Sequence, residues 1–429
     1  MSPSPSDSVA PAGGETVPAG TASAPAAWFI PGVRGIGAAS FLADLGHEIP
    51  TALLPSLLTS TLGAPAAALG VIEGIADGLA GAARLAGGAL ADDLRRRRAV
   101  AVGGYSSTAV LSALLGIAGA VWQVGVLRGA AWAARGLRVP ARNALLADIV
   151  PAGAYGRAYG FERMMDNLGA VGGPLLALLL VSALGVRTAI LLSVIPGLLA
   201  ALAIVYAIRQ IARPTVRTHQ PVRIKLRPVL RGDLGRLMVG VGAFELGNVA
   251  ATLLILRATQ LLAPTLGQQG ATQLALTLYI GYNVAATLAS LPAGRLGDRW
   301  GPLAILTAGV ALFGLAYLGL AVGAASLVLL GISFVAVGVA IGCVEVETAE
   351  HAAVAALAPM EVRGSAFGLL ATVQGFGNLV ASAIAGALWT GVSGQTAFLY
   401  LAAWMLVSLV ALLVLGRLRT GRAPARPSA

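Results

Sequence analysis

Charged residues are scarce in this chain. They make up 11% of its 429 residues, whereas 57% are hydrophobic and the mean hydropathy is +0.83. Soluble domains carry roughly 25% charged residues, so this composition excludes an ordinary soluble protein. The apolar residues come in runs of about twenty, the length that a helix needs to cross a bilayer core. The sequence therefore predicts an all-α polytopic membrane protein surrounded by a lipid bilayer.

Cysteine and lysine are almost absent. Cys343 is the only cysteine, which excludes an intrachain disulfide and a thiolate metal cage. Lys225 is the only lysine, and no glycine-rich loop ends in Gly-Lys-Ser or Gly-Lys-Thr, so ATP is not the expected energy source. No hydrophilic loop combines an acid/base pair with a nucleophile. We therefore expect neither an enzyme nor a bound cofactor or resident metal.

The net charge of +11 is concentrated in a few segments. Arginines gather at Arg95 to Arg98, between Ile208 and Arg236, and in the tail 417–429. Between these segments lie loops that are nearly uncharged, with Arg187 as the clear exception. This is the charge pattern of cytoplasmic loops in multi-pass proteins, and it argues against a nucleic-acid partner.

Apolar runs between breaks give twelve candidate spans, which start near residues 34, 66, 99, 121, 160, 188, 236, 272, 303, 326, 365 and 395. The even number and the basic loops place both termini in the cytoplasm, and we expect a monomer in the cytoplasmic (inner) membrane of a bacterium. Residues 1–27 lack a basic start followed by an apolar core, which predicts a disordered tail and not a signal peptide. The remaining parts are a six-helix bundle (28–208), a cytoplasmic linker (209–235), a second six-helix bundle (236–416) and a basic tail (417–429).

The two halves resemble each other in sequence. Gly88, after the second span, and Gly294, after the eighth, are 206 positions apart and begin the segments GALADDLRRRR and GRLGDRWGP. Gly160 and Gly368 are 208 positions apart in YGRAYGF and RGSAFGL, and ADLGH in the first span matches FELGN in the seventh. A duplication of six spans accounts for these matches.

The segments after spans two and eight resemble the signature of the major facilitator superfamily, G-x-L-[GA]-D-[RK]-x-G-[RK]-[RK]. The matching residues are Gly88, Leu90, Ala91, Asp92, Arg96, Arg97 and Arg98 in the first copy and Gly294, Leu296, Gly297, Asp298, Arg299 and Gly301 in the second. Asp93 stands where Arg or Lys is usual. The resemblance implies twelve transmembrane helices in two six-helix bundles. It also implies that Asp92 and Asp298 latch the two halves together through helix dipoles and Arg side chains.

The fifth span resembles the antiporter motif of the same family, G-x8-G-x3-G-P-x2-G-G. The required spacing is held by Gly160, Gly169, Gly173 and Pro174. Ala177 and Leu178 replace the last two glycines. Together with RVPARNALLADIVP, this span makes the chain similar to poorly characterised bacterial permeases. The motif implies exchange of a substrate against protons, although glycines at such spacing also serve plain close packing of helices.

The first span carries Asp44, His47 and Glu48, which share one helical face because they are three and four residues apart. An ionised side chain at the bilayer centre costs about 2.5 to 3.5 kcal/mol on insertion scales, so these groups should face a water-lined cavity or charged partners. Paired acids suit a site that takes up and releases a proton. In the repeat, Asp44 corresponds to Glu245 and His47 to Asn248.

Span two carries further polar residues. Glu73, Asp77 and Arg84 share a face of span two, and we expect Arg84 to neutralise Asp77. The repeat pairs Glu73 with Tyr279 and Asp77 with Asn283, so the acidic cluster belongs mainly to the first half. The alternative for these acids is interhelical hydrogen bonding without a role in transport.

Two arginines complete the candidate residues. Arg128 in span four resembles an arginine that members of the family place near the proton-handling acid, where it would favour the ionised form of a cavity acid in one conformation. Arg142 corresponds to Glu350 in the repeat. One interpretation is that Arg142 and Glu350 close the cytoplasmic side as an ion pair between the halves; the alternative is that these groups simply lie in the hydrated interface.

The leading functional hypothesis is a proton-driven secondary transporter that exports a small molecule by alternating access. The alternative is an exporter of divalent metal, in which Glu73, Asp77 and Glu245 would complete the oxygen and imidazole ligands of the first span. A membrane sensor that transports nothing would need neither cavity acids nor doubled motifs, so the sequence disfavours it.

Overall fold

The computed structural model describes residues 28–64, 66–210, 226–249, 251–323, 326–344 and 349–420. Every regular element in these residues is helical, which confirms the all-α prediction. The α-helices are α1 (Pro31–Ser56), α2 (Ala66–Ala91), α3 (Leu94–Leu114), α4 (Val121–Ile149), α5 (Tyr155–Leu192), α6 (Val194–Arg209), α7 (Leu226–Val229), α8 (Gly232–Glu245), α9 (Ala251–Trp300), α10 (Pro302–Val322), α11 (Leu327–Val344), α12 (Ala349–Leu357), α13 (Arg363–Gly391) and α14 (Gly394–Thr420). The predicted N-terminal tail lies outside the described residues, as do residues 211–225 of the predicted linker and residues 421–429 of the predicted basic tail.

Two glycine kinks and two divided spans relate these helices to the twelve predicted spans. Gly185 (φ 78°) interrupts α5 and Gly267 (φ 68°) interrupts α9. Both lie in the left-handed region that glycine adopts without steric cost. Gly185 separates spans five and six, and Gly267 separates spans seven and eight. Span seven consists of α8 and the first part of α9, and span ten consists of α11 and α12.

Hydropathy differs strongly among the spans. In the described residues five helical stretches are long and apolar enough to cross a membrane: Leu94–Ile117, Ala152–Arg209, Pro302–Val322, Met360–Gly391 and Gly394–Leu418. The other long helices, α1, α2, α4 and α9, carry charged side chains within their length. Several of those side chains point inward, since Asp44 is 4% exposed and Arg128 is 1% exposed. These helices therefore bury part of their charge inside the protein.

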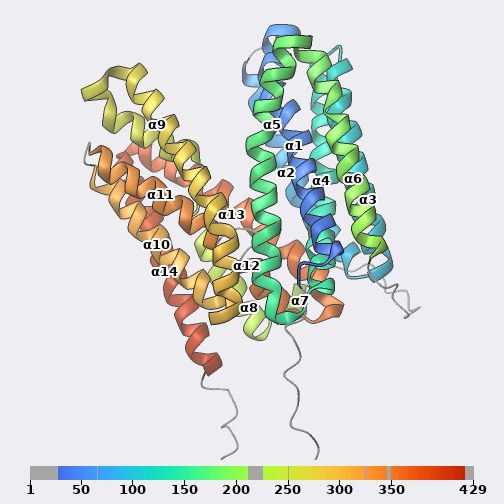
Figure 1. The fold of residues 1–429 in the computed structure, drawn as a ribbon. Helices are drawn as coiled ribbons and strands as arrows, with labels where there is room; N and C mark the ends of the chain where they lie inside the picture. Colours follow the sequence, from blue (N-terminus) through green and yellow to red (C-terminus); the bar gives the residue numbers. More distant parts are fainter. Residues whose placement is uncertain are drawn as a thin grey trace, which may run out of the picture.

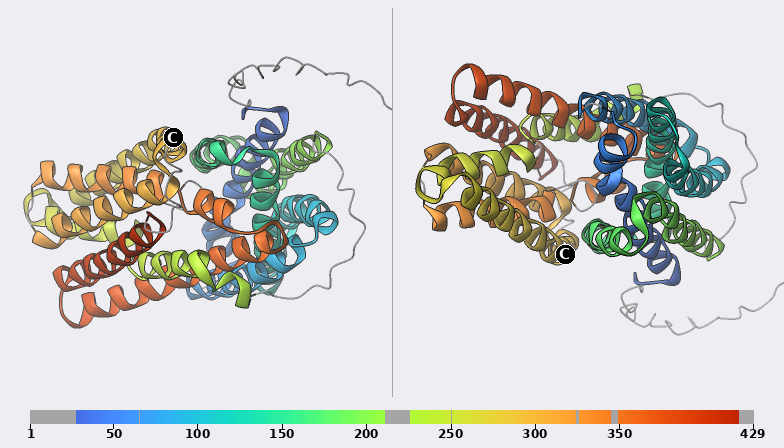
Figure 2. Two further views of the ribbon diagram at one scale, coloured as in Figure 1. Left: turned by 90° about the horizontal axis from the view of Figure 1, so that it is seen from below. Right: turned by 90° about the horizontal axis from the view of Figure 1, so that it is seen from above.

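The helices form two groups, α1 to α6 and α8 to α14, which lie together at one end and separate toward the other (Figure 1). The joined end carries α7 and the start of α8, next to the predicted cytoplasmic linker. Views along the perpendicular direction show the two groups side by side (Figure 2). The chain between Arg209 and Leu226 connects them.

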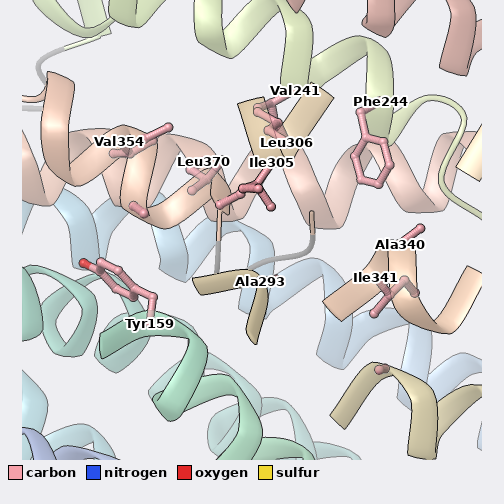
Figure 3. Close-up of a cluster of buried hydrophobic side chains, with 14 of the residues drawn as sticks. Tyr159, Val241, Phe244, Ala293, Ile305, Leu306, Ala340, Ile341, Val354 and Leu370 are labelled. Atoms are coloured by element: carbon pink, nitrogen blue, oxygen red, sulfur yellow. The ribbon is translucent and has the colours of Figure 1, made fainter. Parts of the chain in front are cut away.

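One hydrophobic core reaches from the first bundle into the second. Figure 3 shows Tyr159 of α5 facing Val354 of α12 and Leu370 of α13. The ring of Tyr159 lies 6.0 Å from that of Phe367 and 5.6 Å from that of His351, measured between centroids. A second core cluster lies within the first bundle, around Leu54, Leu57 and Ile190. At their joined end, the bundles are thus held by apolar and aromatic packing.

Glycines bring the two bundles together at backbone distance. A Cβ added at Gly88 of α2 would meet the carbonyl oxygen of Gly364 at 2.7 Å and the Cα of Gly368 at 2.8 Å, both in α13. In the other pair of helices, a Cβ added at Gly156 of α5 would collide with the carbonyl oxygen of Gly294 in α9. These two contacts are copies of each other, because Gly88 corresponds to Gly294 and Gly364 to Gly156 in the sequence repeat.

Arg187, the charge that departs from the loop pattern, and Arg257, near the end of its predicted span, both bind carbonyl groups at helix ends. Arg187 donates to the carbonyl oxygens of Gly116 and Ala118, at 3.0 and 2.7 Å, beyond the end of α3. Arg257 donates from Nε to the carbonyl oxygen of Leu320 in α10 at 3.0 Å. A cation near the last carbonyls of a helix is favourable, and this gives both arginines a structural role.

Candidate functional site

Asp44, His47 and Glu48 of α1 meet Arg135 of α4. His47 lies between the two acids, with Nδ1 3.3 Å from Asp44 Oδ1 and Nε2 3.2 Å from Glu48 Oε1. Arg135 forms an ion pair with Asp44 (3.3 Å) and contacts the imidazole of His47. The Asp44 side chain is 6% exposed and that of Arg135 is 27% exposed. Because Arg135 touches both Asp44 and His47, a proton gained or lost here changes its pairing.

Glu73 and Arg128 form a neighbouring ion pair between α2 and α4. Arg128 NH2 lies 2.9 Å from Glu73 Oε1, and NH1 donates to the hydroxyl of Thr51 at 3.1 Å. The guanidinium of Arg128 stacks on Trp132, 3.4 Å from the ring centroid. The Trp132 ring in turn lies 5.4 Å from that of His47. Trp132 therefore links the Glu73–Arg128 pair to the cluster around Asp44.

The expected pairing of Asp77 with Arg84 is wrong. Asp77 is exposed and accepts a hydrogen bond from the indole nitrogen of Trp132 at 3.0 Å. Arg84 instead donates to the carbonyl oxygen of Ala371 in α13 at 3.1 Å. Seven residues along a helix amount to about 10 Å, which is a long reach for this pair. Arg84 thus connects the two bundles.

A second charged cluster lies deeper in the first bundle, and the sequence did not predict it. Arg142 of α4 contacts Glu162 of α5 at 2.6 Å and donates to the hydroxyl of Ser40 at 3.0 Å. Asp166 lies 4.0 Å from Arg142 and 3.1 Å from Arg163. The only signal for Glu162 and Asp166 was their position in GFERMMDN of the antiporter-like span. Arg142 thus has ion-pair partners within its own bundle.

Glu350, the expected partner of Arg142, is fully buried in α12. Its carboxylate accepts a hydrogen bond from the side-chain amide of Gln374 at 2.7 Å. The next residue, His351, stacks on Phe367 at 5.3 Å. The ion pair between Arg142 and Glu350 stays a prediction.

In the second bundle the candidate residues lie at a break in span seven. α8 ends at Glu245, and Asn248 follows in a turn before α9 begins. The amide of Asn248 donates to Glu245 Oε2 at 3.1 Å, and Asn378 of α13 donates to the carbonyl oxygen of Asn248 at 3.1 Å. The corresponding stretch of α1 is continuous helix. A broken helix at mid-span is typical of transporter binding sites.

Tyr279 and Asn283, the counterparts of Glu73 and Asp77, stay within α9. The Asn283 amide donates to the carbonyl oxygen of Tyr279 at 2.9 Å, and the Tyr279 ring stacks on Tyr282 at 5.3 Å. This hydrogen bond and this ring contact both lie within α9. At these positions the first bundle thus carries acidic side chains, whereas the second carries a tyrosine and an asparagine.

The glycines of the fifth span seat α1 directly on α5. A Cβ added at Gly173 would collide with Cβ of Glu48, and one added at Gly169 would lie 3.0 Å from Cβ of Asp44. Gly160, the first glycine of the motif, faces Ser290 of α9 in the other bundle. Pro174 is exposed on α5. The motif therefore fixes the backbone that carries the two acids and also contributes to the contact between the bundles.

This packing predicts that Gly169→Ala destabilises the protein by about 1 to 3 kcal/mol, the usual cost of overpacking. The added methyl would meet backbone of α1, including the nitrogen of Leu45 at 3.0 Å. Thermal unfolding of the detergent-solubilised protein measures the effect. Gly172→Ala is the matched control, because its methyl meets only the end of the flexible Leu45 side chain. Equal stability of the two variants would contradict this account.

Asp92 and Asp298 each bind the first turn of a helix in the opposite bundle. Asp92 accepts hydrogen bonds from the backbone amide (2.8 Å) and the hydroxyl (2.5 Å) of Ser365, near the start of α13. Asp298 accepts from the amide of Gly156 at 2.7 Å and from Nε of Arg157 at 2.6 Å, near the start of α5. Amide groups at a helix start lack intrahelical partners and favour an anion.

The remaining motif residues support this region. Arg97 is fully buried and binds Asp148, which also pairs with Arg363 of the second bundle at 3.1 Å. Asp93, which departs from the family pattern, caps α3 by accepting from the amide of Arg95 at 2.9 Å. Arg96 lies 3.6 Å from Asp93. In the second copy Arg299 is exposed, and Gly301 has a φ of 91° that favours glycine.

Metal ligands do not converge at this site. Within the described residues no group of three His, Cys, Asp or Glu side chains is arranged to hold a metal ion. The acids proposed as ligands are engaged by arginines, with Asp44 held by Arg135 and Glu73 by Arg128.

Comparison with known proteins agrees with the fold and with the repeat. The model of the Major Facilitator Superfamily matches residues 36–256 and again residues 239–429. An uncharacterised MFS-type transporter of Methanocaldococcus jannaschii is 28% identical over 369 residues, which cover 85% of this chain and 90% of that protein. An uncharacterised protein of Mycobacterium bovis is 33% identical over 192 residues, 44% of this chain and 47% of that protein.

Solved structures share the whole fold at low sequence identity. A bacterial homologue of the iron transporter ferroportin, in its outward-facing state, has a TM-score of 0.74 at 14% identity and covers 90% of this chain and 99% of that one. The Escherichia coli fucose:proton symporter has a TM-score of 0.71 at 14% identity with the same coverage. The human organic anion transporter MFSD10 has a TM-score of 0.65 at 16% identity, covering 89% of this chain and 99% of that one. The chain therefore belongs to the Major Facilitator Superfamily and is a multi-pass membrane transporter, not an enzyme.

Proposed function

We propose that this protein is a proton-coupled antiporter that exports a small molecule by alternating access. The observation that carries the proposal is the cluster in which Arg135 contacts both Asp44 and His47 while His47 bridges to Glu48. In such a cluster a proton and the arginine compete for the same carboxylate. Buried ionisable groups inside a membrane protein mark ion or substrate pathways.

The coupling follows from this competition. When Asp44 is ionised, it pairs with Arg135; when it takes up a proton, Arg135 loses its counter-charge and turns toward a new partner. Several members of the network are partly exposed, among them Arg135, Glu48 and Glu73, with side chains 27%, 24% and 31% exposed. A substrate entering from that side competes for Arg135 or for Glu73. Binding of the substrate and binding of the proton thus oppose each other, as antiport requires.

Alternating access uses the two bundles as rigid halves. With the predicted topology, the end at which Asp92 and Asp298 join the bundles is cytoplasmic, so this arrangement is outward-facing. The acid latches and the glycine contacts hold that end closed, and their release would open it. We propose in addition that the protein works as a monomer in the inner membrane of a bacterium, with both termini in the cytoplasm.

Export of a divalent metal is the weaker function. The acids that would bind the ion already have arginine partners, and a second cation near those arginines would be repelled. A proton neutralises a carboxylate without adding a cation that must be coordinated. The arrangement of charges therefore favours the proton.

Proteoliposomes with an imposed pH gradient test the proposal. Purified protein is reconstituted with a pH-sensitive dye, and organic cations, organic anions and divalent metals are offered in turn. Uptake of one organic substrate that depends on the direction of the gradient, together with proton movement in the opposite direction, supports antiport. Substrate flux that ignores the gradient, or proton movement in the same direction, contradicts it.

A further inference from the structure

A small cavity lies between helices of the first bundle. It has a volume of about 10 Å³, roughly the room that one water-sized particle needs. Its walls come from α1, α3, α4 and the start of α6. The polar lining residues are His47, Tyr105, Thr108, Ser112, Arg138 and Ser193.

Arg138 is the only lining residue with a permanent charge. Its side chain is almost buried, with 4% of the residue exposed, and it stacks on the Tyr105 ring at 4.0 Å. Within the described part of the chain it has no carboxylate within 4.0 Å and donates no hydrogen bond. Asp44 is engaged by Arg135 and His47. A buried cation without a paired anion is strongly unfavourable, so the cavity has an unmet need for negative charge.

Three of the four hydroxyls in the lining are unsatisfied, whereas that of Thr108 donates to the carbonyl oxygen of Gly104 at 2.7 Å. The hydroxyl oxygens of Tyr105, Ser112 and Ser193 are buried and have no hydrogen-bond partner in the described residues. Each of these residues is at most 2% exposed. Native proteins leave few buried polar groups unpaired, and three around one cavity indicate a small occupant. Each hydroxyl has a proton to donate.

We infer that this cavity binds one halide ion, chloride under physiological conditions. The lining offers a guanidinium and three hydroxyl donors and contains no carboxylate, which fits a small anion and not a cation. A water molecule would satisfy the hydroxyls but would leave the charge of Arg138 unpaired. A cavity with room for about one water-sized particle suits a small anion better than sulfate or an organic anion. Because His47 forms part of the same wall, the halide site lies directly behind the Asp44–His47–Glu48 cluster.

Equilibrium binding of radioactive chloride to the full-length protein in lipid nanodiscs tests the inference. We expect saturable binding of one ion, displaced by bromide and not by gluconate or sulfate. Arg138→Met should weaken chloride binding at least about tenfold, since it removes a charged donor. Ser193→Ala should weaken it about threefold, and Ser408→Ala, which removes a buried serine hydroxyl in the other bundle, should leave it unchanged.

A second measurement covers the case in which a variant folds poorly. Chloride should raise the thermal unfolding temperature of the wild type in a saturable way, as any ligand of the native state does. In chloride-free buffer Arg138→Met should unfold at the same or a higher temperature than the wild type, because a buried unpaired charge is gone. The inference is overturned if the wild type shows no saturable chloride binding. It is also overturned if Arg138→Met and Ser193→Ala both bind chloride like the wild type.

Discussion

Transport driven by a pH gradient is expected to be lost in the double variant Asp44→Asn, Glu48→Gln. Both carboxylates that flank His47 become permanently neutral, so the cluster can no longer exchange a proton, and Arg135 keeps its charge without a partner. A shift of 1.4 kcal/mol between two conformations changes their ratio tenfold. We therefore expect the gradient-driven rate to fall at least about tenfold and its dependence on pH to disappear.

The measurement compares initial rates in proteoliposomes over a series of imposed gradients. Glu361→Gln is the matched control, because it removes a carboxylate that is exposed outside the bundles' core, and it should transport like the wild type. Thermal unfolding of both proteins separates loss of fold from loss of coupling. A double variant with the wild-type dependence on pH would show that the proton is carried elsewhere.

Gly364→Ala is expected to keep the joined end of the two bundles from closing. The added methyl would lie 2.6 Å from the carbonyl carbon of Ala91 and 2.6 Å from the nitrogen of Asp92 in α2. These are backbone atoms, so no side chain can turn aside. If overpacking costs about 2 kcal/mol in the closed state only, the closed population falls about thirtyfold relative to the open one.

Accessibility of a single cysteine reports this change. In a Cys343→Ser background, Ser290→Cys places a thiol at a fully buried position of α9 that faces Gly160 of α5. Addition of Gly364→Ala should make this thiol reactive toward a membrane-impermeant reagent from the predicted cytoplasmic side. Gly386→Ala is the control, because Gly386 lies in α13 like Gly364 but has open space around its added methyl. This variant should leave the reactivity low. Equal reactivity in the two variants would argue against close packing as the cause of closure.

The fold could be predicted from the sequence because its determinants are local. Apolar runs of about twenty residues define the spans, and the doubled signature around Gly88 and Gly294 places two of the connections between them. The same signature singled out Asp92 and Asp298, whose partners are backbone amides at helix starts. Such partners need no particular side chain, so one copy of the motif was enough to name the acid.

The charged network could be predicted only in part because its partners come from different helices. Spacing along α1 was sufficient to group Asp44, His47 and Glu48. Nothing in that spacing indicates that Arg135, and not Arg128, would meet them, since the two arginines lie about two turns apart on one face of α4. Arg84 was misjudged for the same reason: its side chain binds a carbonyl of α13, a contact between residues far apart in the chain.

The break after Glu245 also could not be read from the sequence. FELGN and ADLGH look alike, yet α8 ends in the first and α1 continues through the second. The difference depends on tertiary contacts, among them the hydrogen bond from Asn378 to the carbonyl oxygen of Asn248. A freed carbonyl is stable only where another helix supplies a donor.

The two acid latches have a consequence for how the halves can change over time. Asp92 and Asp298 recognise main-chain amides at the starts of α13 and α5, where one copy presents Ser365 and the other Gly156 and Arg157. Any residue that leaves the main chain in place can supply these amides, whereas the contacts with the Ser365 hydroxyl and with Nε of Arg157 depend on those side chains. Substitutions away from this contact in either receiving helix therefore leave the latch intact. One half could acquire a new substrate surface while the other kept its proton chemistry, without a compensating mutation at the gate.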